Sequence, residues 1–165
     1  MVNSVKHIIF GALFLCGLFT SVAQVQDTTS TTKVSVQSGY LEKKPEFPNA
    51  IIYTKDPSGQ VYIVHEGVEM WCDQAYVYLN DNFVKAYGNV RLTQGDTVTM
   101  RSKYGEYNGN TSFAFASGDV ILTEPKTTLR TDTLYFDRVK QQAYYRTGGT
   151  VRDTASTLTS RIGRY

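Results

Sequence analysis

The sequence has few of the side chains that catalyse reactions or hold metals. Its 165 residues contain two cysteines and two histidines, and Cys16 and His7 fall in the apolar start of the chain. A zinc site needs a cluster of such ligands, and neither a phosphate-binding glycine loop nor a nucleophile elbow occurs. His65 stands beside Glu66, which in a strand would point to the opposite face. We therefore expect no enzyme, no metal site and no cofactor.

An excess of one charge is also missing. The 17 Lys and Arg residues nearly balance 15 Asp and Glu residues, for a net charge of +2, and the longest run of like charges is Lys43-Lys44. Proteins that bind nucleic acids usually concentrate a basic surplus. The sequence therefore predicts no nucleic-acid partner.

Long apolar runs are confined to the start of the chain. Residues 8–19 are an uninterrupted apolar stretch, and Ser21-Val22-Ala23 offers the small residues of a cleavage site before Gln24. A membrane-spanning helix needs about 20 apolar residues, which this stretch does not reach. We predict that residues 1–23 are a secretory signal peptide. An uncleaved membrane anchor over residues 8–23 is the alternative.

Cleavage before Gln24 would leave Cys72 as the only cysteine. A single thiol cannot form a disulfide within the chain, so strand pairing and apolar burial must stabilise the fold. Free cysteine is among the most often buried residues. We predict that Cys72 is packed inside, with a reactive or intermolecularly paired thiol as the alternative.

The residues that are present favour β-structure. The chain has 12 Tyr and 8 Phe residues, which suit a pleated, half-buried surface. Residues 24–50 are polar and unpatterned, and we expect a linker there. From residue 51 onward, short β-rich runs alternate with turn signals, as where Val90 and Leu92 alternate with Arg91. Residues 51–165 are therefore predicted to form one all-β domain.

A block of seven residues recurs along this domain. The copies begin at Trp71, Arg101, Arg130 and Thr159, with offsets of 30, 29 and 29 residues. The second position is always small, and glycines that suit bends or bulges recur between the blocks, as at Gly88 and Gly118. Such a repeat stacks short strands into a shared apolar interior. The fourth block ends with the chain, so we expect an incomplete last repeat with an exposed edge strand.

These pieces resemble the OstA-like (organic solvent tolerance) N-terminal family, which includes the lipopolysaccharide transport proteins LptA, LptC and the N-terminal part of LptD. The resemblance covers roughly residues 60–165 and is carried by the order of the pieces. They are Met70–Tyr76, Ala86–Thr97, Tyr104–Thr111, Gly118–Thr123, Leu129–Asp137 and Gly148–Val151. It implies a β-jellyroll open at both ends that carries lipid acyl chains in its groove between the two membranes of a Gram-negative cell. Family members join end to end through edge strands.

From this resemblance we expect a periplasmic protein, either free or associated with the outer membrane, that binds lipopolysaccharide or lipid A acyl chains. Its other partners would be further jellyroll transport proteins or a second copy of itself, through edge strands. Candidate groove-lining residues are the apolar positions of the strands: Val90, Leu92, Val98, Met100, Phe113, Phe115, Val120, Leu122, Leu129, Leu134 and Phe136. Basic residues that could meet phosphates at the rim are Arg91, Arg101, Lys103 and Arg130. The alternative is a secreted structural or adhesive β-repeat protein whose interior is a closed core.

Overall fold

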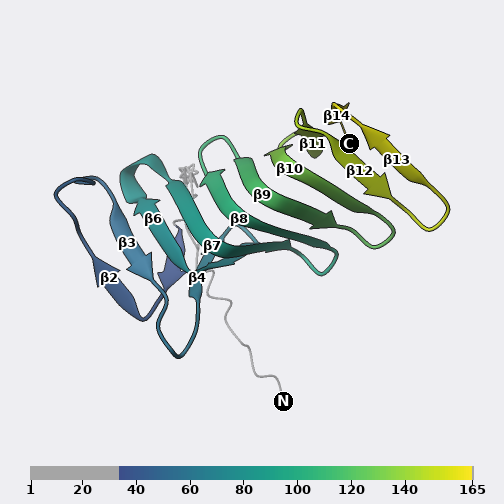
Figure 1. Ribbon diagram of the computed structural model, residues 1–165. Helices are drawn as coiled ribbons and strands as arrows, with labels where there is room; N and C mark the ends of the chain where they lie inside the picture. Colours follow the sequence, from purple (N-terminus) through teal and green to yellow (C-terminus); the bar gives the residue numbers. More distant parts are fainter. Residues whose placement is uncertain (1–33, 165) are drawn as a thin grey trace, which may run out of the picture. The chain divides into compact units, whose positions relative to one another are not determined.

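The computed structural model describes residues 34–164, which belong to one compact unit, residues 31–165 (Figure 1). The predicted signal peptide and Tyr165 lie outside the described residues. The strands are β1 Ser35–Gln37, β2 Tyr40–Glu42, β3 Ile51–Thr54, β4 Val61–His65, β5 Val68–Cys72, β6 Gln74–Tyr78, β7 Phe83–Gln94, β8 Val98–Asn108, β9 Phe113–Thr123, β10 Thr128–Asp137, β11 Gln142–Tyr145, β12 Gly149–Arg152, β13 Thr157–Ser160 and β14 Gly163–Arg164. One 3₁₀ turn, η1, spans Leu79–Asp81. The predicted all-β fold is confirmed. Among residues 34–164 there is no helix with the length and apolar character that crossing a membrane requires.

The sheet begins earlier in the chain than the sequence analysis places it. β1 and β2 lie inside residues 24–50, where a linker is expected, yet β1 pairs with β4 and β2 pairs with β3. Each of the two strands is only three residues long and mostly exposed. Without a buried face they lack the apolar alternation that marks a strand in a sequence.

All the strand pairs are antiparallel and join into one sheet, which divides into two layers. The long strands β7, β8, β9 and β10 run through both layers, as Figure 1 shows for their continuous arrows. The first layer has the order β2-β3-β6-β7-β8-β9-β10-β11-β14. The second has the order β1-β4-β5-β7-β8-β9-β10-β12-β13. Each long strand therefore contributes one half to each layer.

Two of the long strands, β7 and β9, change layer at bulges, as predicted for the recurring glycines. Gly88 and Asn89 have φ angles of 73° and 46°, and the pairing of β7 with β8 shifts register there. Gly118 and Asp119 repeat the arrangement in β9, with φ angles of 78° and 54°. Left-handed backbone of this kind is open to glycine and tolerated by Asn and Asp. The repeat thus sets the positions at which the sheet folds over into the second layer. We call the line through these positions the fold line.

The small second position of the first three repeat blocks is buried beside this line, whereas that of the fourth block is exposed. The Ser102 hydroxyl donates a hydrogen bond to the Tyr104 carbonyl oxygen at 2.9 Å, and the Thr131 hydroxyl donates to the Gly148 carbonyl oxygen at 2.7 Å. Cys72 occupies the same position in the first block and is fully buried. The hydroxyls satisfy carbonyl groups at the bend, where the regular ladder is interrupted. The predicted packing of Cys72 is confirmed.

The two faces of the first layer carry different side chains. The inner face is apolar and often small, as at Ala86, Ala114 and Ala116. The outer face carries a row of rings in contact across neighbouring strands, with centroid separations of 4.9–6.3 Å: Phe47, Tyr76, Tyr87, Tyr104, Phe115, Tyr135 and Tyr144. Ring contacts between neighbouring strands stabilise a sheet. We call these seven residues the aromatic row.

Candidate functional site

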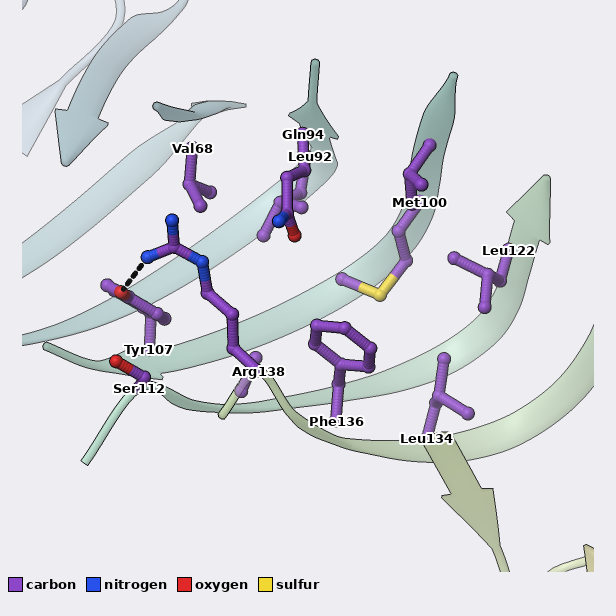
Figure 2. A pocket seen from close by; sticks show the side chains of 12 residues that line it. Val68, Leu92, Gln94, Met100, Tyr107, Ser112, Leu122, Leu134, Phe136 and Arg138 are labelled. Carbon is purple, nitrogen blue, oxygen red and sulfur yellow. Dashed lines mark hydrogen bonds between the residues drawn. The ribbon is translucent and has the colours of Figure 1, made fainter. Parts of the chain in front are cut away.

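The inner faces of the two layers enclose a narrow apolar cavity. Figure 2 shows the side chains of Leu92, Met100 and Phe136 gathered around it from β7, β8 and β10. Its volume is about 40 Å³. The alternation of each strand directs every second side chain to this side. The lining is completed by Val68, Gln94, Val98, Tyr107, Ser112, Ala114, Leu122, Leu134 and Arg138. We call this space the inner cavity.

Nine of the eleven predicted groove residues face the interior. Leu92, Val98, Met100, Leu122, Leu134 and Phe136 line the inner cavity itself. Val90, Val120 and Leu129 are buried in the apolar clusters beside it, each at 2% exposure or less. The structure therefore brings these nine residues together, and their contact with lipid stays a prediction.

Phe113 and Phe115 do not join the other nine. They lie on the outer face of the first layer, where Phe115 belongs to the aromatic row and both rings contact Tyr135. Their neighbours Ala114 and Ala116 take the inward positions instead. From hydrophobicity alone, Phe is expected inside rather than Ala. Here the ring contacts on the outer face hold both phenylalanines outside.

A second, wider space lies beside the inner cavity. This outer cleft has a volume of about 310 Å³ and shares Gln94, Val98, Leu122 and Phe136 with the inner cavity. Its remaining walls come from both layers: Thr97 and Glu124 from turns of the second layer, and Gln141 and Ala143 from the first. Both spaces are partly open to the surface at the rim, by which we mean the ends of the strands away from the bulges, where the two layers face each other.

Farther along the same rim, polar contacts tie the layers together. Arg138 follows β10, and its Nη2 donates to the Glu66 carbonyl oxygen at 2.6 Å while its Nη1 lies 3.2 Å from Glu66 Oε2. Arg138 Nη1 also donates to the Tyr107 hydroxyl at 3.4 Å, the bond drawn dashed in Figure 2. That hydroxyl lies 3.2 Å from His65 Nδ1 in β4. We call Arg138, Glu66, Tyr107 and His65 the rim clasp.

The basic residues expected at the rim lie elsewhere. Arg91 stacks on Trp71, with its guanidinium carbon 3.9 Å from the ring centroid. Lys103 pairs with Asp119 at the fold line, at 2.5 Å. Arg101 and Arg130 are exposed on the outer side of the second layer. The cation at the rim is Arg138, and its signal in the sequence is the alternation Leu134, Phe136, Arg138, which continues the inward face past the end of β10.

The site has the chemistry of an apolar container. Across residues 34–164, no three His, Cys, Asp or Glu side chains gather as they would to hold a metal ion. Burial raises the pKa of the Cys72 thiol to about 12, so this thiol stays protonated at neutral pH. The groups at hand can enclose hydrocarbon and, at Arg138, meet an anion.

Comparisons with known proteins agree with this geometry. The family described as OstA-like protein matches residues 33–165. No curated protein matches the sequence. Among solved structures, the chain is similar to LptH of Pseudomonas aeruginosa, the LptA-homologous periplasmic component of the lipopolysaccharide transport device of that organism. The TM-score is 0.60 at 15% sequence identity, and the match covers 80% of this chain and 93% of LptH.

Proposed function

The chain belongs to the OstA-like protein family, and on that premise we propose that it is a periplasmic protein that carries lipopolysaccharide acyl chains between its two layers. The observation that carries the proposal is the apolar interior that opens between the rims. Transfer of an acyl chain from water to such a surface gains about 0.8 kcal/mol for each CH₂ group. Several acyl chains would bind strongly without any directional contact.

The size of the interior adds a condition to this proposal. An engineered apolar cavity that binds one benzene molecule has a volume of about 150 Å³, whereas the inner cavity has only about 40 Å³. We therefore propose that the layers move apart along the open rim when an acyl chain enters, with the fold line as the hinge.

Other proteins would meet this chain at the ends of its sheet. We propose that edge strands join it to further jellyroll transport proteins or to a second copy, forming part of a bridge between the membranes or of outer-membrane assembly. The alternative, a structural or adhesive protein with a closed core, has less support because the inner cavity and the outer cleft are both partly open to the surface.

Site-specific photocrosslinking tests the acyl-chain proposal. A small diazirine amino acid would replace Leu92 or Met100, and Phe115 on the outer face would serve as the matched control. After illumination with purified lipopolysaccharide, we expect adducts at positions 92 and 100 and none above background at 115. Adducts that form only at 115, or at none of the three positions, would reject an acyl-binding interior.

A further inference from the structure

We propose that Arg138 is the anion-binding residue of this groove, and that an anionic head group opens the rim by taking Arg138 from Glu66. The inference rests on the proposed function, because it needs an amphiphile whose chain lies in the inner cavity. Its ligand class is an alkyl chain with a phosphate or similar anion at one end. Lipid phosphates and simple alkyl phosphates share this chemistry.

Arg138 is placed where the alkyl chain and the anionic head group of such a ligand would meet. Its side chain lines the inner cavity together with Leu134 and Phe136 and is one-fifth exposed. Figure 2 shows the guanidinium extending away from these apolar groups toward Tyr107. A chain that lies along Met100 and Phe136 would therefore bring its head group to the guanidinium.

The present partners of Arg138 can be exchanged. The Glu66 carboxylate is 41% exposed, so water screens its attraction to Arg138. Within residues 34–164, three hydrogen bonds occupy two nitrogens of the guanidinium, which has five donors in all. A phosphate offers three oxygens in a geometry that matches the guanidinium fork. Bound to both Nη atoms, it can therefore displace both oxygens of Glu66, the carboxylate Oε2 and the main-chain carbonyl oxygen.

Replacing Glu66 by a phosphate at Arg138 would weaken the contact between the two layers. Arg138 belongs to the first layer and Glu66 to the turn between β4 and β5 of the second layer, so their contact spans the rim. Once the guanidinium binds a phosphate, Glu66 faces a second anion and is repelled. The contact between His65 and Tyr107 remains deeper in the rim clasp. Head-group binding would thus loosen the rim while leaving the fold line intact.

Matched amphiphiles separate this role from a merely structural one. Calorimetric titration of the mature chain with dodecyl phosphate and with uncharged dodecyl maltoside, both below micelle formation, reports the effect of head-group charge. In Arg138→Gln we expect the affinity for dodecyl phosphate to fall on the order of tenfold, with that for dodecyl maltoside unchanged. Glu66→Gln should bind dodecyl phosphate severalfold more tightly. The exposed Arg146, changed to Gln, is the control and should alter neither affinity.

Each other outcome is decisive. If the unmodified chain binds neither amphiphile, the acyl-binding groove itself is wrong, and the role of Arg138 with it. If both amphiphiles bind but Arg138→Gln lowers both affinities equally or neither, the groove stands and the head-group site is rejected. If Arg138→Gln does not fold, Glu66→Gln still decides, because an unchanged or weaker affinity for dodecyl phosphate would contradict competition at Arg138.

Discussion

Single residues of this protein take their character from the face of the strand on which they lie. Cys72 illustrates the inward face: it is fully buried, and burial raises the pKa of its thiol to about 12 from the ordinary 9.0. The thiolate is the reactive form of cysteine. A residue that chemistry alone would mark as reactive is therefore expected to act as an apolar packing residue.

We expect Cys72 to resist alkylation in the folded protein. In a chain that begins at Gln24, a thiol reagent at pH 8 should modify no cysteine until denaturant is added, and then one per chain. Adding a second cysteine at the exposed Val139 provides the control, since that thiol should react at once in the folded state. Rapid modification of Cys72 without denaturant would show that its side of the sheet opens readily.

The same thiol gives a pH dependence with a definite sign. In the unfolded chain Cys72 ionises near its ordinary pKa of 9.0, whereas in the folded chain it stays neutral up to about 12. Ionisation above pH 9 therefore favours the unfolded state, and stability should fall as the pH rises through this window. Replacing Cys72 by Ser should reduce that part of the alkaline loss, which urea unfolding at pH 8 and pH 10 would measure.

Some residues of the candidate site could be predicted from the sequence, and others could not. The alternation around Val90, Leu92 and Met100 was enough to place these side chains inside. Phe113 and Phe115 were placed wrongly, since their strand reads equally well with either face inward and hydrophobicity favours Phe. The two rings are held outside by neighbours on other strands, among them Tyr135 and Tyr104. The sequence of one strand does not show which strands it will pair with.

At the scale of elements, the fold depends on strands long enough to enter both layers. Bulges in β7 and β9, each paired with unbulged neighbours, allow this, and the glycines at the bulges tolerate little substitution. A Cβ at Gly88 would lie 2.8 Å from the Asp73 side chain, and one at Gly118 would lie 2.9 Å from Lys103. Both glycines also have positive φ angles, which alanine adopts only with strain.

We therefore predict that Gly88→Ala and Gly118→Ala each destabilise the protein by about 1–3 kcal/mol. Gly59→Ala is the matched control, because nothing lies within 4 Å of its added Cβ and its φ is not positive. Urea unfolding followed by circular dichroism gives the free energy for each variant. Equal stability of all three variants would mean that the bulges do not require glycine.

Several features of the strands could be predicted from the sequence. The repeat of about 30 residues predicted stacked strands and placed the bends at Gly88 and Gly118, because turn chemistry is local and survives in a single sequence. β1 and β2 were not predicted because they are short and exposed. Their pairing also depends on strands that come later in the chain. The division of the sheet into two layers likewise follows from pairing at a distance.

At the scale of the folded unit, the sheet has ends that no described strand covers. Among residues 34–164, β2 pairs only with β3 and β13 pairs only with β12. Large apolar side chains are exposed near both ends: Leu41 is 60% exposed, Leu158 66% and Ile162 60%. Open edges of this kind template pairing with another chain. A contact between opposite ends leaves a free end on each copy, so it adds one copy after another unless the rotation between copies closes a ring.

We predict that the purified chain forms a concentration-dependent series of oligomers through these two ends. The double variant Leu158→Lys with Ile162→Lys should run as a monomer in size-exclusion chromatography with light scattering, since lysine on an edge opposes pairing. Leu41→Lys should do the same from the other end. Val139→Lys, in the exposed turn after β10, adds the same charge as Leu41→Lys but away from both ends, and it should leave the series intact.

Mixing the two kinds of variant identifies which ends meet. The double lysine variant keeps its β2 end and Leu41→Lys keeps its β13 end, so the mixture has one working contact and both of its outer ends are blocked. Head-to-tail pairing therefore predicts a dimer and nothing larger. If like ends paired instead, one variant alone would already form dimers and the mixture would add none. That result would contradict extension of the sheet from chain to chain, which a bridge between membranes requires.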